Sequence, residues 1–310
     1  MKRYLVTGGC GFIGSHLVDA LLARGHAVRV LDDLSTGKHI HKSADVELVV
    51  GDVADPEAVR DAIEGTAGCF HLAAVASVER GNADWLGTHR TNATGAITVF
   101  DAAKKAGCER PIPVVIASSA AVYGDAGANP AAEDAKMRPV SAYGADKASC
   151  ELHASVASHV HRVPTCCLRF FNVYGPRQDP KSTYSGVISV FCDRLKEDRP
   201  VTIYGDGFQT RDFIFVADVV RALLLAMSRC STDGAVFNVC SGSPTSVRDL
   251  AMLIGNILGR RPNIAFGDAR RAEIRHSVGD PRKAQRCLGF SASVDLAAGL
   301  ALTLAQDASW

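Results

Sequence analysis

Hydrophobic and polar positions follow two alternating patterns along the first half of the chain. Short apolar runs recur, and each is followed by a turn and then by a longer stretch in which apolar residues return every three or four positions. The short runs predict buried strands, and the longer stretches predict amphipathic helices. Regular alternation of the two is typical of a parallel sheet covered by helices on both faces. We therefore expect an α/β fold with a doubly wound parallel sheet.

The predicted elements can be given by residue number. Strands are expected over 4–7, 27–33, 46–52, 69–74, 113–119 and 165–171, and helices over 15–24, 56–65, 85–106 and 142–161. Asp55 and Pro56 suit the start of the second helix, as N-cap and first helical residue. After residue 172 the pattern is less regular, with helices expected near 186–196, 216–229, 246–258 and 293–306 and short strands at 201–205 and 236–240.

Spaced glycines follow the first predicted strand. Gly8, Gly9, Gly11 and Gly14 separate this strand from the first helix. Missing β-carbons at such a turn let the backbone approach a pyrophosphate, and the N-terminus of the helix favours the anion. Asp32 ends the second strand 18 residues after Gly14, near the spacing of the acid that binds an adenosine ribose.

These features favour a dinucleotide site over a tight turn with an unrelated surface acid. Asp33 follows Asp32, and two carboxylates would repel a 2′-phosphate. We expect NAD rather than NADP. The sequence thus predicts a Rossmann-type NAD-binding domain over residues 1–172, to which later segments return, and a smaller, interleaved C-terminal substrate domain over residues 173–310.

Composition and charge exclude several classes of protein. The chain of 310 residues has a formal net charge of +1 and no block of like charges, so we expect no nucleic-acid partner. It has no signal-peptide pattern and no run of 18 uncharged apolar residues, so we expect no membrane association and a cytoplasmic location. The 10 cysteines and 10 histidines are scattered without metal-ligand spacing, so we expect reduced thiols rather than disulfides, and no metal site.

The candidate chemistry lies in the stretch "SAYGADKAS". Tyr143 and Lys147 are four residues apart, so on a helix both point to one face, where the ammonium favours a phenolate. The alternative is a solvated helix face carrying this pair by chance. Ser118 and Ser119 at the end of the preceding strand can present hydroxyls to the same oxygen, which favours a catalytic group in which the phenolate is the base.

Six ordered motifs carry a family resemblance: "TGGCGFIGSHL", "SSAAVYG", "YGADK", "LRFFNVYGPRQDP", "GDGFQTRDFIFVADVV" and "ARRAEIRHSVGD". Through them, residues 3–290 resemble the extended short-chain dehydrogenase/reductases, and among these the UDP-sugar 4-epimerases. The resemblance implies NAD as cofactor, a UDP-sugar as substrate and a homodimer paired through the helices at 85–106 and 142–161.

The resemblance also implies roles for individual residues. The catalytic residues would be Ser119, Tyr143 as base and Lys147. NAD would be bound by Gly8, Gly11, Phe12, Ile13, Gly14, Asp32, Asp33, Asp52, Val53, Leu72, Ala73, Ala74, Asn92, Ser118, Tyr143, Lys147 and Phe170. The UDP-sugar would be bound by Ser119, Tyr143, Asn172, Gly186, Val187, Tyr204, Arg211, Phe213, Arg270, Glu273 and Ser277.

Two positions narrow the implied reaction, which is transient oxidation at C4 and return of hydride to the opposite face. Related 4,6-dehydratases carry an Asp-Glu pair, and UDP-glucuronate decarboxylases a Glu, where this chain has Ala120 and Ala121. A UDP-glucuronate 4-epimerase, a 4-ketoreductase and a dinucleotide-sensing scaffold stay open. Ser277 stands where the resembling enzymes gate the C2 substituent, so we expect room for N-acetylated sugars. The alternative is that Ser277 only packs or caps a turn, and Arg211 has the alternative of a surface ion pair with Asp212.

Overall fold

The largest sheet of the computed structural model has seven parallel strands. The structure describes residues 1–37, 43–106, 110–127, 129–180, 186–269 and 274–305. In this part of the chain the strand order is β10-β6-β5-β4-β1-β2-β3, and every neighbouring pair is parallel. The strands are β1 (Arg3–Thr7), β2 (Ala27–Asp32), β3 (Val46–Val50), β4 (Cys69–His71), β5 (Val114–Ser119), β6 (Thr165–Phe170) and β10 (Ala235–Val239).

Helices cover both faces of this sheet, which confirms the predicted doubly wound, Rossmann-type fold. One apolar layer lies under α1 (Phe12–Leu22), α8 (Val216–Ser228) and α10 (Arg282–Leu288). The other lies under α2 (Pro56–Ile63), α5 (Gly95–Ala106) and α6 (Ala142–His159). The direction of the strand order reverses between β1 and β4, and at such a switch point the carboxyl ends of the strands leave a crevice for a ligand.

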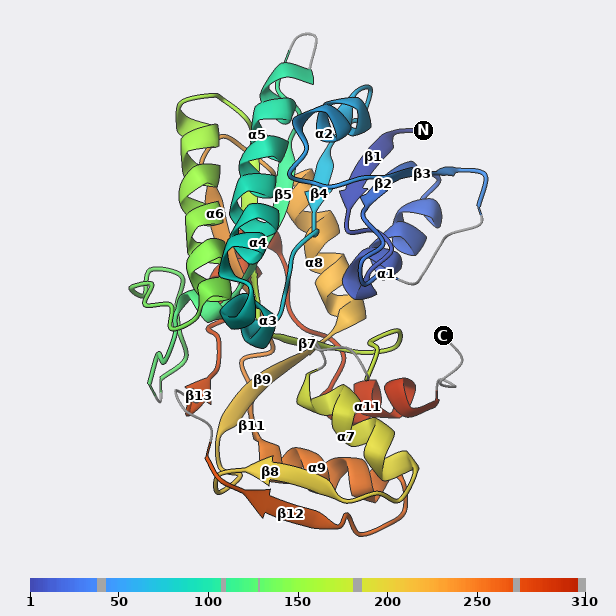
Figure 1. Ribbon diagram of the computed structural model, residues 1–310, viewed down its shortest axis with the longest axis vertical. Coiled ribbons are helices and arrows are strands. Elements are labelled where there is room, and N and C mark those ends of the chain that lie inside the picture. Colours follow the sequence, from blue (N-terminus) through green and yellow to red (C-terminus); the bar gives the residue numbers. More distant parts are fainter. Residues whose placement is uncertain (38–42, 107–109, 128, 181–185, 270–273, 306–310) are drawn as a thin grey trace.

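The smaller part of the molecule lies below the large sheet in Figure 1. Its core is formed by α7 (Val187–Lys196), α9 (Val247–Ile257) and α11 (Leu296–Ala305) with the parallel pair β8 (Val201–Tyr204) and β12 (Ile264–Gly267). A further sheet is centred on β9 (Thr210–Phe215), which pairs with β7 (Asn172–Tyr174), β11 (Pro244–Ser246) and β13 (His276–Ser277). Because β10 is a strand of the large sheet and α8 packs on that sheet, the chain crosses between the two parts more than once. The domain boundary at residue 172 stays a prediction.

Several predicted boundaries were wrong. The helix expected over 85–106 consists of α4 (Trp85–His89), a π-helical stretch η1 (Arg90–Thr94) and α5. A short helix α3 (Val78–Ala83) precedes it, and it begins at Ser77, whose hydroxyl accepts a hydrogen bond from the Arg80 amide. The sequence did not predict α3, α10, β7, β9, β11, β12 or β13, most of which are too short to show a period.

The described residues contain no helix that is both long and apolar enough to cross a membrane. Every cysteine among them is a free thiol.

Candidate active site

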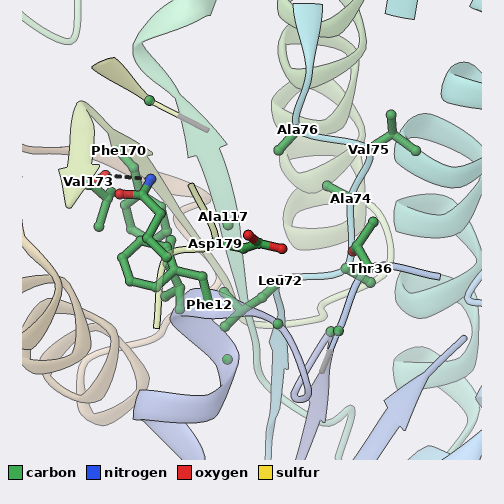
Figure 2. A pocket seen from close by; sticks show the side chains of 18 of the residues that line it. Phe12, Thr36, Leu72, Ala74, Val75, Ala76, Ala117, Phe170, Val173 and Asp179 are labelled. Atoms are coloured by element: carbon green, nitrogen blue, oxygen red, sulfur yellow. Dashed lines mark hydrogen bonds between the residues drawn. The ribbon is translucent and has the colours of Figure 1, made fainter. Parts of the chain in front are cut away.

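A cavity of about 980 Å³ opens at the carboxyl ends of β1, β2, β4, β5 and β6 and extends to α7. In Figure 2, Leu72, Ala74 and Ala76 follow one another after β4, and Phe170 and Val173 lie on the opposite side of the view. Most of the predicted site residues line this cavity. They are Gly8, Gly11, Phe12, Ile13, Gly14, Asp32, Asp33, Asp52, Val53, Leu72, Ala73, Ala74, Ser118, Ser119, Tyr143, Lys147, Phe170, Asn172, Gly186, Val187 and Phe213.

Other predicted site residues are not part of this lining. Asn92 is buried behind it, where its side-chain amide bonds both the N–H and the C=O of Val75, at 2.8 and 3.2 Å, and so supports the wall. Tyr204, Arg211 and Ser277 are not lining residues either. Arg270 and Glu273 lie outside the described residues.

Arg211 and Ser277 are nevertheless neighbours, because they are register partners between β9 and β13. Asp212, which follows Arg211, is fully buried, and its carboxylate accepts hydrogen bonds from the backbone amides of Ser241, Gly242 and Gly279. Burial raises the pKa of Asp212, and these hydrogen bonds oppose the shift. The carboxylate of Asp212 therefore ties three backbone segments together instead of forming a surface ion pair.

The glycine turn is shaped to let a phosphate approach the backbone. A β-carbon on Gly14 would lie 2.1 Å from the carbonyl oxygen of Gly8, and Gly8 itself has a φ of +71°. At Gly11 a β-carbon would meet only that carbonyl oxygen, at 3.3 Å, so the space beyond it is open. Helix α1 begins here with no side-chain cap, which leaves its first N–H groups for a ligand. These residues fit a pyrophosphate.

Asp32 is held at the end of β2 by two amides. The N–H of Cys10 donates to Oδ2, and the N–H of Leu34 donates to Oδ1, both at 2.9 Å. Burial raises the pKa of Asp32, the two amide hydrogen bonds oppose this, and the charge of Asp33 adds a smaller increase. An oriented carboxylate in the cavity wall is suited to accept hydrogen bonds from ribose hydroxyls.

Thr7 and His71 support the opposite wall, and sequence reasoning missed both. The Thr7 hydroxyl accepts hydrogen bonds from the amides of Leu72 and Ala73, both at 3.2 Å, and lies 2.8 Å from Nδ1 of His71. Because its lone pairs serve the amides, the hydroxyl donates its proton to Nδ1, which makes the imidazole an acceptor there. Burial, helped by the charge of Lys147, lowers the pKa of His71 to about 3.

Tyr143 and Lys147 lie one turn apart on α6, as predicted. The helix begins at Ser141, whose hydroxyl accepts from the amide of Gly144. The ammonium of Lys147 is buried, donates to the carbonyl oxygen of Ala117 at 2.7 Å, and lies 5.9 Å from the centre of the Tyr143 ring. The hydroxyl of Ser119 accepts from the amide of Ala121, so its proton stays available to a ligand. The arrangement can hold and move a proton at the end of β5.

The chain resembles proteins of one family over nearly its whole length. The model of the family described as "NAD dependent epimerase/dehydratase family" matches residues 4–240. The UDP-glucose 4-epimerase of Mycolicibacterium smegmatis is 37% identical over 308 residues, which cover 97% of each chain. The chain belongs to the NAD dependent epimerase/dehydratase family.

Solved structures agree with this membership. The UDP-glucose 4-epimerase of Thermotoga maritima, in complex with UDP-glucose, is 34% identical with a TM-score of 0.92 and 97% of each chain covered. MoeE5 in complex with UDP-glucuronic acid and NAD is 36% identical with a TM-score of 0.87 and the same coverage. The predicted family and NAD as cofactor are confirmed, and the chain is an enzyme of the epimerase/dehydratase family.

Proposed function

We propose that this enzyme is an NAD-dependent UDP-hexose 4-epimerase that interconverts UDP-glucose and UDP-galactose. The observation that carries the proposal is that Ser119, Tyr143 and Lys147 line the same cavity as the glycine turn and Asp32. In addition, alanines at positions 120 and 121 leave no acid where the related dehydratases and decarboxylases carry one. These observations favour a redox-neutral reaction at C4.

In this reaction the residues of the chain handle the proton, the orientation and the charge. Tyr143 takes the proton of the C4 hydroxyl, and the Ser119 hydroxyl bonds the same oxygen. The ammonium of Lys147 stabilises the phenolate and offers hydrogen bonds to the nicotinamide ribose. Bound NAD supplies the acceptor for the C4 hydride and returns it. Asn172, Val187 and Phe213 line the end of the cavity that we assign to the uridine diphosphate.

The test is turnover of UDP-glucose by the wild type and by Tyr143→Phe, followed by proton NMR of the anomeric signals. We expect the galactose epimer without build-up of NADH, and a loss of kcat of about 10³-fold in the variant because no other group takes the proton. Tyr4→Phe is the matched control, since Tyr4 packs against His26 and Phe70 away from the cavity. A Tyr143→Phe protein with most of its turnover contradicts the assignment.

A second candidate function is 4-epimerisation of UDP-glucuronate. Arg80 lines the same cavity as Tyr143. It lies on α3, where a β-carbon on the neighbouring Gly81 would stand 3.7 Å from the backbone nitrogen of Tyr143. A guanidinium near the reacting sugar suits a carboxylate at C6. Arg80→Met should then lower kcat/KM for UDP-glucuronate about tenfold and change it little for UDP-glucose. Equal losses on both substrates would remove this candidate.

The breadth of the sugar pocket and the assembly are proposed as well. Turnover of UDP-N-acetylglucosamine by the wild type and by Ser277→Tyr tests the expectation that Ser277 leaves room for N-acetylated sugars, and an unchanged preference between the plain and the N-acetylated sugar would contradict it.

For the homodimer, the apolar side chains of Ile97, Leu152 and Val156 on α5 and α6 are 41%, 60% and 47% exposed. A second copy of the chain would cover them, so Val156→Glu should convert a dimer to a monomer in light scattering. A wild type that scatters as a monomer would contradict the homodimer.

A further inference from the structure

We propose that Glu151 is a positioning residue for the catalytic group, and that its partner Arg169 keeps the ammonium of Lys147 available to that group. This inference rests on the proposed function only where it is tested by turnover of a UDP-sugar; the test by NAD binding does not depend on it. Tyr143, Lys147 and Glu151 follow one another at four-residue steps along α6, so all three face the sheet. Lys147 and Glu151 are buried, with relative exposures of 2% and 6%.

Lys147 and Glu151 of α6 hold consecutive residues of β5. Lys147 donates to the carbonyl oxygen of Ala117 at 2.7 Å, and the hydroxyl of Ser118 donates to Oε1 of Glu151 at 2.5 Å. The hydroxyl of the next residue, Ser119, makes no such bond and accepts from the amide of Ala121 instead. The proton of Ser118 is committed to Glu151, which leaves Ser119 as the hydroxyl that serves the reacting oxygen.

Arg169 of β6 neutralises the buried carboxylate. Its Nε donates to Oε1 of Glu151 at 2.9 Å and its Nη2 donates to Oε2 at 2.7 Å. Its Nη1 donates to the hydroxyl of Tyr123 and to the carbonyl oxygen of Glu133. Burial alone would lower the pKa of Arg169, but the hydrogen bonds and charge of Glu151 raise it, so the guanidinium stays charged.

The pairing decides where the ammonium of Lys147 goes. A lysine and a glutamate four residues apart on one helix face attract each other, and the attraction is strong in a buried setting. Because Arg169 engages both oxygens of Glu151, Lys147 stays on the carbonyl oxygen of Ala117 beside Tyr143. Without Arg169, the unpaired carboxylate would draw the ammonium away from the ring of Tyr143 and from the ribose that we expect Lys147 to bind.

The first experiment measures NAD binding and needs no turnover. Calorimetric titration should show NAD affinity about tenfold weaker in Arg169→Met than in the wild type. The double variant Glu151→Met/Arg169→Met removes both charges and should recover the affinity to within about threefold, since an apolar pair can replace a buried ion pair. Wild-type affinity in the single variant, or no recovery in the double variant, would overturn the proposal for Arg169.

The second experiment tests the hydrogen bond between Ser118 of β5 and Glu151 of α6, and it can be done even if Arg169→Met fails to fold. Ser118→Ala leaves the Glu151–Arg169 pair intact and should lower kcat about tenfold with KM for the UDP-sugar within about twofold. Ser118→Thr restores the donor and should recover kcat. A kcat unchanged in Ser118→Ala, or equally low in Ser118→Thr, would overturn the role of Glu151. If the wild type turns over no UDP-sugar, the proposed function fails, and the NAD titration still decides the role of Arg169.

Discussion

Acid should destabilise this protein through one buried histidine under the cofactor cavity. His71 is 1% exposed, and its Nδ1 accepts the proton of the Thr7 hydroxyl, which in turn holds the amides of Leu72 and Ala73. A protonated imidazole has no lone pair at Nδ1 and would leave that hydroxyl proton without an acceptor. The informative substitution is His71→Asn, because the side-chain oxygen of Asn can accept at this position and cannot be protonated.

The magnitude follows from the pKa of His71, which falls from 6.5 to about 3 on folding. The folded state holds the neutral form, so the stabilisation is complete above pH 6.5 and is lost as pH falls from 6.5 towards 3. At pH 5 the imidazole is protonated in the unfolded chain and neutral in the folded one. Because pH 5 lies about 1.5 units below the unfolded pKa, this protonation stabilises the unfolded state by about 2 kcal/mol. The wild type should therefore lose about 2 kcal/mol of unfolding free energy between pH 8 and pH 5 through this residue.

Urea unfolding at both pH values, followed by circular dichroism, measures the loss. The decrease in unfolding free energy between pH 8 and pH 5 should be about 2 kcal/mol smaller in His71→Asn than in the wild type. His153→Gln is the matched control, since His153 is exposed on α6 and its replacement should leave the drop unchanged. Equal drops in the wild type and in His71→Asn would refute the reasoning.

Four further predictions concern the cavity and the residues that support it. Gly14→Ala should cost about 3 kcal/mol of unfolding free energy, because its β-carbon would overlap the carbonyl oxygen of Gly8. Gly11→Ala should keep the wild-type melting temperature and weaken NAD binding about tenfold in calorimetry, and normal binding would contradict the role of this glycine. Asp32→Asn should reduce the preference for NAD over NADP about tenfold in paired titrations, since one repelling charge is gone; an unchanged ratio would count against it. Asp212→Asn should lower the unfolding free energy by about 3 kcal/mol in urea, because an amide cannot accept all the hydrogen bonds of the buried carboxylate.

The sequence predicted the parts of the site that depend on local spacing. Gly11, Asp32, Tyr143 and Lys147 were found because a turn, a strand end and one helix face bring their groups to the cavity. Glu151 was missed because its partner Ser118 lies 33 residues earlier in the chain, and only the packing of α6 on β5 joins them. Spacing along a chain carries no signal for such a pair.

The same limit applies to the short strands and to the substrate end. The two residues of β13 are a strand only because they pair with β9, which lies more than 60 residues earlier in the chain. Neither apolar periodicity nor turn residues mark a strand of that length. The pairing of Ser277 with Arg211 therefore had no signal in the sequence, and the role of Ser277 in the sugar pocket stays a prediction.

The origin of the seventh strand has a consequence for how the protein is made. The strand β10 pairs with β6 from Cys166 to Phe170, and its Asn238 bonds Tyr123, Ala131 and Asp280. A ribosome must therefore deliver the chain to residue 239 before the large sheet can be completed, by which time β7, α7, β8 and β9 of the smaller part have also emerged. Nascent chains that stall near residue 172 would expose the open edge of β6, and such an edge is a template for aggregation. Completion of the cofactor-binding sheet thus depends on synthesis of the first segments of the smaller part.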